Sequence, residues 1–215
     1  MKTILKLFFF LSVILGTNCL SANAQGRQAY FELFGTDSTS IVMLGNSLTA
    51  GVDWHELLHN GNVVNRGIVG DTSIDIMNRL ECVTSGKPAK IFLLAGVNDI
   101  SHDLTPDSVM ICVNELLDSI QSQTPDTKLY LQSLLPINNS FERYKTMIGK
   151  EQTVRDVNVL LKQEAEKRNI TFIDLYDAFC DEDQNLKADW TADGLHLLLP
   201  AYVQWRDLII DYINE

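Results

Sequence analysis

Three residues in this chain have the types and spacing of a nucleophile, its base and an orienting acid. Ser47 lies in a G-N-S-L stretch directly after an apolar run, and Asp193 and His196 stand three residues apart in DWTADGLHLLLP. A serine hydroxyl is a weak nucleophile that needs a base. A carboxylate that holds one imidazole nitrogen leaves the other free to take the serine proton. The pattern predicts acyl transfer, although each motif alone is more often a turn or a surface pair.

Two further stretches offer donors for the negative charge that acyl transfer develops. Gly70 lies in NRGIVGDTS after the second apolar run, and Asn98 lies in LLAGVNDIS after the third. Oxyanion stabilisation needs donors aimed at the developing charge. Gly70 can supply a backbone N–H and Asn98 a side-chain amide, although an Asn-Asp pair at a strand end is also an ordinary turn.

A second signature, H-E-L-L-H, competes with the first. His55, Glu56 and His59 have the spelling of a zinc-protease helix, in which two histidines at i and i+4 bind the metal and the glutamate is the base. Two glycines bracket the segment, and asparagines occupy the places of the glycine and histidine in the extended motif. We therefore expect an ordinary amphipathic helix and no metal site, and a zinc peptidase remains the minor alternative.

Alternating apolar runs and helical patterns supply the elements that must position these residues. The predicted strands are Ser40–Leu44, Asn62–Asn65, Lys90–Ala95, Lys128–Leu134 and Ile170–Asp174. The predicted helices are Gly51–Leu58, Ser73–Cys82, Pro106–Gln121, Lys150–Arg168 and Ala201–Ile213.

Strands that alternate with helices indicate an α/β protein with a parallel sheet covered on both faces. Ligands of such sheets bind beyond the carboxyl ends of the strands, and the loops with Ser47, Gly70 and Asn98 should open on that edge. The chain has neither repeats nor a linker, which predicts one domain over residues 25–215. Leu135–Gly149, the longest irregular stretch, is a candidate rim over the site, and His102 is a candidate rim residue.

The first 24 residues have the features of a secretory signal peptide. Two lysines precede an apolar run of about ten residues, too short for a membrane span, and an A-N-A stretch ends at Ala24. We expect cleavage there and a secreted or periplasmic protein. The net charge of −11 argues against nucleic acid and against stable association with anionic membranes.

Cysteine usage excludes a disulfide scaffold. Cys82, Cys112 and Cys180 remain after cleavage, which permits one disulfide at most and leaves its existence open. Cys112 shares a helical face with apolar residues, so we expect a buried, inert thiol there.

Four motifs, in chain order, resemble the SGNH or GDSL-type hydrolase superfamily of serine esterases. They are G-N-S-L with Ser47, G-D-T with Gly70, G-V-N-D with Asn98 and D-G-L-H with Asp193 and His196. Within this superfamily, NRGIVGDTSIDIMNRL and LQSLLPIN look closest to the platelet-activating-factor acetylhydrolase catalytic-subunit type and to related bacterial sugar-ester deacetylases. The resemblance implies a flavodoxin-like three-layer sandwich with a five-stranded parallel sheet in the order 2-1-3-4-5. It also implies Ser47, Asp193 and His196 as the triad, with the Ser47 N–H, Gly70 and Asn98 as the oxyanion hole.

One position departs from the family pattern, because Asn46 stands where the family usually has aspartate. This position is outside the triad, so only the local hydrogen bonding near Ser47 comes into question.

We therefore expect an esterase without a cofactor that acts on short acyl esters through an acyl-enzyme. By family analogy and export, the expected substrate is an O-acetylated carbohydrate. Hydrolysis of a lysophospholipid or thioester remains open, as does a binding module without activity. The alcohol half of the substrate and the oligomeric state stay open.

Overall fold

The computed structural model describes residues 25–215, so the signal peptide predicted for residues 1–24 lies outside the described residues. The chain divides into two compact units, and the second, Gly35–Glu215, contains the whole sheet. Of the first unit the structure describes one helix, residues 25–34. No helix within residues 25–215 is long and apolar enough to span a membrane. The predicted domain boundary after Ala24 stays a prediction.

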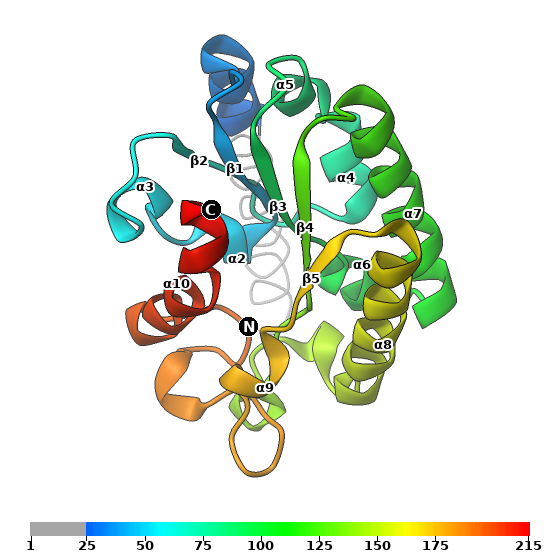
Figure 1. Cartoon of the computed structure of the whole chain (residues 1–215). Helices are drawn as coiled ribbons and strands as arrows, with labels where there is room; N and C mark the ends of the chain where they lie inside the picture. The colour runs from blue at the N-terminus through cyan, green and yellow to red at the C-terminus, as the bar shows by residue number, and fades with distance from the viewer. Residues whose placement is uncertain (1–24) are drawn as a thin grey trace, which may run out of the picture. The chain divides into compact units, whose positions relative to one another are not determined.

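The second unit is built on one five-stranded parallel sheet, as predicted (Figure 1). The strand order is β2-β1-β3-β4-β5, which confirms the flavodoxin-like order implied by the resemblance. The strands are β1 (Ile41–Gly45), β2 (Val63–Gly67), β3 (Lys90–Leu94), β4 (Lys128–Gln132) and β5 (Thr171–Ile173).

Continuous apolar runs explain why the central strands form. Every residue of β1 and β3 is buried, as expected for parallel strands covered by helices on both faces. In the register, Gly45 pairs with Gly67 of β2 and with Leu94 of β3. The carboxyl ends of these three strands are therefore level, and the loops that carry Ser47, Gly70 and Asn98 leave the sheet side by side.

Helices cover the sheet on both faces. In Figure 1, α2, α3 and α10 lie on one side of the sheet, and α4, α6, α7 and α8 lie on the other. The helices are α2 (Ser47–Ala50), α3 (Trp54–Leu57), α4 (Ser73–Asn78), α5 (Glu81–Thr84), α6 (Val97–Ser101), α7 (Pro106–Gln123), α8 (Glu151–Arg168), α9 (Tyr176–Phe179) and α10 (Leu199–Asn214). Short 3-10 turns are η1 (Asn139–Phe141), η2 (Lys145–Met147) and η3 (Ala188–Trp190).

Two predicted helices are wrong in extent. The helix expected over Gly51–Leu58 begins only at Trp54, because Asp53 caps it by accepting hydrogen bonds from the next amides. The helix expected over Ser73–Cys82 is interrupted at Arg79, where the backbone leaves helical values (φ −111°, ψ 12°). The short helices α2, α6 and α9 were not predicted.

The three described cysteines are free. Cys82 is buried, but Cys112 is only half-buried at the margin of the apolar face of α7, so the prediction of a buried thiol there is wrong. Burial raises the pKa of Cys112, and burial raises that of Cys180 to about 11. Both thiols are therefore weakly reactive near neutral pH.

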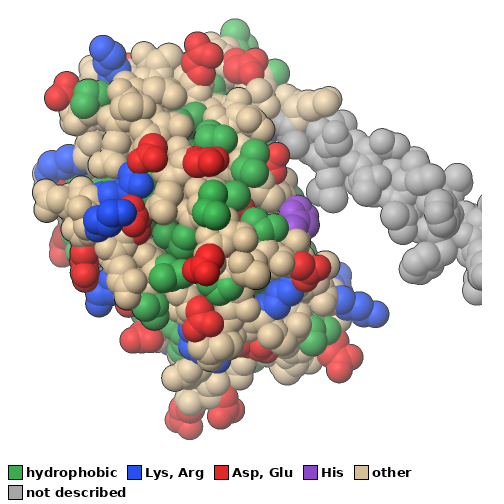
Figure 2. Space-filling model, turned by 90° about the vertical axis from the view of Figure 1, so that its right-hand side faces the viewer, with side chains coloured by type: hydrophobic (Ala, Val, Ile, Leu, Met, Phe, Trp, Pro, Cys, Tyr) green, Lys and Arg blue, Asp and Glu red, His purple; other side chains and the backbone are tan. Residues whose placement is uncertain are grey.

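Acidic side chains are scattered over the α7 and α8 side of the protein and form no single patch (Figure 2). Apolar side chains show between them, and Ile111 and Val159 are among the exposed apolar residues of these two helices. On this face, the acidic residues that contribute to the negative net charge are thus spread out and not clustered.

Candidate active site

Ser47 begins α2 immediately after β1. Asn46 precedes it as the N-cap, and its side-chain oxygen accepts a hydrogen bond from the Leu48 amide at 3.0 Å. Asn46, which stands where the family usually has aspartate, therefore still accepts the capping hydrogen bond. Gly45 is needed for close packing, since a Cβ there would lie 2.3 Å from the Thr49 Oγ1 and 2.6 Å from the Leu94 carbonyl oxygen. Its φ is not in the left-handed region, so close packing, not backbone conformation, is the reason for glycine.

Side chains from three other elements hold the four-residue helix α2 in place. The Tyr202 hydroxyl of α10 donates to the Leu48 carbonyl at 2.8 Å. The Thr49 carbonyl accepts from the Trp54 Nε1 at 2.8 Å and from the Asn65 Nδ2 at 3.0 Å. A helix this short has little stability of its own, so these bonds fix the direction in which Ser47 points.

Asp193 and His196 lie in a tight turn between η3 and α10. One carboxylate oxygen of Asp193 accepts from the amides of Leu195 at 3.0 Å and His196 at 2.8 Å. The other lies 2.9 Å from the His196 Nδ1. Burial raises the pKa of Asp193, but the hydrogen bonds from His196 and the backbone lower it more, and the net effect is a lowered pKa. Gly194 has a φ of +87°, and a Cβ there would lie 2.1 Å from the Asn138 carbonyl oxygen.

The turn brings the imidazole to the serine. The His196 Nε2 lies 2.9 Å from the Ser47 Oγ, although the two residues are 149 positions apart. The His196 side chain is 34% exposed and that of Asp193 is 20% exposed. With a proton on Nδ1 directed at Asp193, Nε2 is left to accept the serine proton. The structure therefore brings together the three residues singled out in the sequence.

Tyr144 adds a contact to the same imidazole. Its hydroxyl lies 3.1 Å from the His196 Nδ1, and the two rings meet edge to face with centroids 5.2 Å apart. Tyr144 belongs to Leu135–Gly149, which contains η1 and η2 and was predicted to be a rim. This segment thus borders the site through Tyr144.

The two other expected oxyanion donors lie in the loops after β2 and β3. Gly70 is exposed with a φ of +87°, which favours glycine, and a Cβ there would meet no atom within 4 Å. Asn98 lies in the first turn of α6, and its Nδ2 donates to the Asp71 carbonyl at 2.8 Å. One amide hydrogen of Asn98 is thereby fixed, and the second is available for a ligand.

A comparison with known families agrees with this geometry. The model of the GDSL-like Lipase/Acylhydrolase family matches residues 43–202. The chain belongs to this family. It is therefore an acylhydrolase that acts on carboxylic esters, and the resemblance and enzyme class predicted from the sequence are confirmed.

Relatives of this GDSL-like hydrolase include subunit alpha2 of platelet-activating factor acetylhydrolase IB. The Rattus norvegicus and Homo sapiens proteins are each 27% identical over 169 residues, which covers 75% of this chain and 70% of the relative. A GDSL-like lipase of Bacteroides thetaiotaomicron has a similar structure, with a TM-score of 0.73, 24% identity and coverage of 82% of this chain and 88% of that one. An acetyl xylan esterase shares the fold at 20% identity, with a TM-score of 0.68 and coverage of 81% and 99%.

The zinc-protease interpretation of H-E-L-L-H is overturned by the geometry of α3. The helix ends at Leu57, and His59 follows it in the left-handed region with a φ of 48°. His55 and His59 therefore do not share a helical face. The described residues contain no group of three metal-ligating side chains. His102 is exposed at the end of α6, and a role at the rim stays a prediction.

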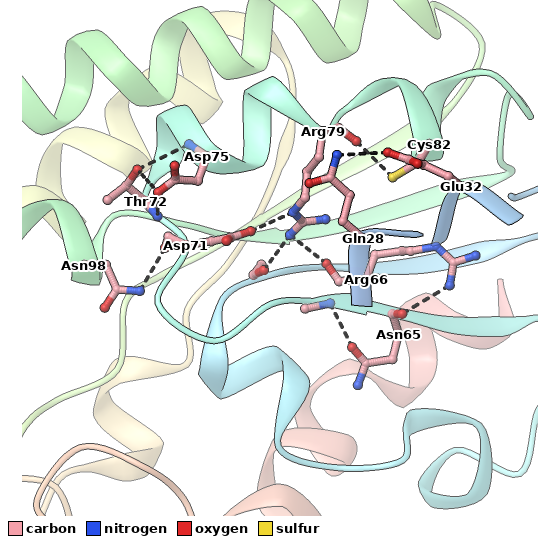
Figure 3. A network of polar contacts seen from close by, with 12 residues as sticks. Gln28, Glu32, Asn65, Arg66, Asp71, Thr72, Asp75, Arg79, Cys82 and Asn98 are labelled. Atoms are coloured by element: carbon pink, nitrogen blue, oxygen red, sulfur yellow. Dashed lines mark hydrogen bonds and ion pairs between the residues drawn. The ribbon is translucent and has the colours of Figure 1, made fainter. Parts of the chain in front are cut away.

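Sequence reasoning missed several residues that shape this GDSL-like site. Thr191 bonds the backbone of the Asp193–His196 turn, and its position two residues before an aspartate was the available signal. Tyr144 had no signal beyond its place in an irregular segment. Arg79 had none, because an arginine beside Asn78 and Glu81 is ordinary on an amphipathic helix. Figure 3 shows that Arg79 lies next to Asp71, which in turn contacts Asn98.

Proposed function

We propose that this GDSL-like hydrolase is a serine esterase that removes short acyl groups, above all acetyl, from carbohydrate esters. The observation that carries the proposal is the continuous path from Ser47 through His196 to Asp193, with 2.9 Å at each step. A nucleophile, its base and the base's orienting acid within hydrogen-bond distance are the requirements of covalent acyl transfer.

The proposed reaction has two halves. The Ser47 Oγ attacks the acyl carbon while its proton passes to the His196 Nε2. The tetrahedral intermediate then loses the alcohol, whose oxygen takes the proton back from His196. Water attacks the acyl-serine ester with His196 again as base, and the carboxylic acid leaves as Ser47 recovers its proton. Asp193 stays ionised throughout and orients the imidazole.

The proposed oxyanion hole consists of the Ser47 amide, the Gly70 amide and the Asn98 side chain. These groups follow β1, β2 and β3, whose carboxyl ends are level and adjacent in the sheet. Preorganised donors of this kind stabilise charge in the transition state without reorganisation during the reaction.

Two considerations support the proposed substrate. The curated relatives are named acetylhydrolases, which favours an acetyl group. The signal peptide predicted over residues 1–24 would export the enzyme to the periplasm or the medium, where polymeric carbohydrate esters are accessible. We accordingly propose a secreted or periplasmic location.

A lipid ester is the second candidate, favoured by exposed apolar residues near the site. Val69 precedes Gly70, and Leu198 and Leu199 follow His196 by two and three residues. Their exposed fractions are 51%, 42% and 64%. Where such side chains form one continuous surface beside a site, they are typical of surfaces that contact apolar ligands.

A fluorophosphonate probe and a panel of esters test these proposals together. The probe should label the wild-type protein and fail to label Ser47→Ala. Purified enzyme is then assayed on acetylated xylo-oligosaccharide, lysophosphatidylcholine and an acetyl thioester, with p-nitrophenyl acetate, butyrate and octanoate as chain-length standards. We expect the highest kcat/KM on the acetylated sugar and on p-nitrophenyl acetate. A kcat/KM that rises toward octanoate, or is highest on the lysophospholipid, would replace the carbohydrate proposal with the lipid one.

A further inference from the structure

Arg79 is a buried cation that lies below the loops of the proposed oxyanion hole. Its side chain is only 3% exposed. The Nε donates to the Asp71 carboxylate at 2.6 Å, and one terminal nitrogen donates to the carbonyls of Gly45 at 3.0 Å and Arg66 at 2.9 Å (Figure 3). Those two carbonyls lie at the carboxyl ends of β1 and β2, so a single guanidinium joins both strand ends to the loop after β2.

Asp71 extends this connection to the loop after β3, which carries Asn98. Its carboxylate pairs with Arg79, and its backbone carbonyl accepts the Asn98 Nδ2 at 2.8 Å. Asp71 also follows Gly70 directly in the chain, so the position of its backbone determines where the Gly70 amide points. The Asp71 side chain is only 11% exposed, and burial raises its pKa even though Arg79 acts in the opposite direction.

We propose that Arg79 and Asp71 act together as positioning residues that hold the oxyanion donors in place. Arg79 holds Gly45, two residues before Ser47, and Asp71 holds Asn98 and adjoins Gly70. The inference rests on the proposed function, since it assigns a support to that same oxyanion hole. Neither side chain is expected to touch the substrate.

The chemistry of the guanidinium explains why arginine is needed. Its planar fork can donate in several fixed directions at once, whereas a lysine ammonium is a compact point charge on a flexible stem. Lysine at position 79 would keep the positive charge near Asp71, but it could not hold the three acceptors in the same geometry. The arrangement of the loops, more than the charge itself, should therefore change in Arg79→Lys.

The pair is better explained by positioning than by stability. Burying two charges costs desolvation energy that their attraction often only offsets, so a buried ion pair is weak evidence for a stabilising role. A catalytic group displaced by about 1 Å, by contrast, can lose about 100-fold in rate. A positioning role therefore predicts that kcat falls in a variant that is still folded under the conditions of the assay.

The test is a double-mutant cycle between Arg79→Lys and Asn98→Ala, with kcat and KM measured on p-nitrophenyl acetate. Arg79→Lys should lower kcat by about 10- to 100-fold, with KM within about threefold of wild type. In the Asn98→Ala background the same substitution should lower kcat by much less, because residues that act as a unit are non-additive.

Arg168→Lys is the matched control. Arg168 pairs with Asp118 and Glu164 on α7 and α8, at the end of α8 that leads into β5 and away from the carboxyl edge of the sheet. Its replacement should leave both kinetic constants unchanged. Urea denaturation shows whether each variant is folded. If Arg79→Lys does not fold, Asp71→Asn takes its place in the cycle, with the same expected changes in kcat and KM.

The outcomes separate this inference from the function on which it rests. Inactive Ser47→Ala together with a coupled loss in the cycle supports the inference. If Ser47→Ala is inactive but Arg79→Lys keeps wild-type kcat, the positioning role is overturned and the esterase proposal stands. A loss that is equal in both backgrounds overturns the part of the role that acts through Asn98. Full activity in Ser47→Ala would instead overturn the proposed function and the inference with it.

Discussion

Replacing Thr191 by valine should show how far the Asp193–His196 turn depends on one buried hydroxyl. Thr191 is 4% exposed. Its hydroxyl donates to the His196 carbonyl at 2.7 Å and accepts from the amides of Gly194 at 2.9 Å and Asp193 at 3.3 Å. Valine has nearly the same shape, so the substitution removes these three bonds, together with the longer contact of 3.5 Å between the hydroxyl and the Asp193 Oδ1, and little else.

The expected magnitude follows from those bonds. A hydrogen bond contributes a net ~0.5–1.5 kcal/mol, and a buried group left without a partner costs ~1–3 kcal/mol. Gly194 is buried, so water cannot readily replace the bond to its amide. We expect Thr191→Val to lower the free energy of unfolding by about 2–4 kcal/mol. Because the His196 backbone loses its anchor, we also expect kcat to fall about 10- to 100-fold.

Two assays check this prediction. Urea denaturation gives the free energy of unfolding, and initial rates on p-nitrophenyl acetate give kcat and KM. Thr191→Ser is the matched control, because serine keeps the hydroxyl and loses the methyl group that valine retains. If the valine variant is as stable and as active as the serine variant, the hydroxyl does not hold the turn and the reasoning is wrong.

Three other measurements address the rest of the site. Asn98→Ala should lower kcat about 10²- to 10³-fold with little change in KM; a raised KM at constant kcat would make Asn98 a substrate-binding residue. EDTA and Glu56→Ala should both leave activity intact, whereas a loss restored by Zn²⁺ would revive the metal interpretation. Asp193 has a lowered pKa in the folded protein, so the stability it confers is present above about pH 4 and is lost as pH falls through that lowered pKa. The difference in unfolding free energy between wild type and Asp193→Asn should accordingly shrink from pH 5 to pH 3, and a constant difference would contradict this assignment.

The sheet was predictable because its signal is local. The buried runs of β1 and β3 have the continuous apolar character that parallel strands require, and the predicted strands lie within two residues of the observed ones. The short helices were less predictable, since their ends depend on capping side chains and on contacts far away in sequence. Arg79 illustrates the limit: the apolar pattern runs through it, but the backbone leaves the helix there, and its side chain binds carbonyls at the strand ends.

The same distinction applies to the site. Ser47, Asp193 and His196 were recognisable because their chemistry restricts residue type, and short motifs surround them. Thr191 and Tyr144 act through the geometry of a turn and of an irregular rim segment, and many residue types are compatible with such places in a sequence. Their contacts became evident only once the loops were placed in space.

The strand order explains why the candidate site lies at β1. The chain passes from β1 to β2 in one direction and then crosses back over β1 to reach β3. Because parallel crossovers are right-handed, these opposite steps place the following helices on opposite faces, as seen for α2 and α4 (Figure 1). Loops on either side of such a reversal diverge and leave room for a ligand. Ser47 begins α2 on one face of the sheet. Gly70 precedes α4 and Asn98 lies in the first turn of α6, both on the other face. Donors can therefore approach an ester from both sides of the end of β1.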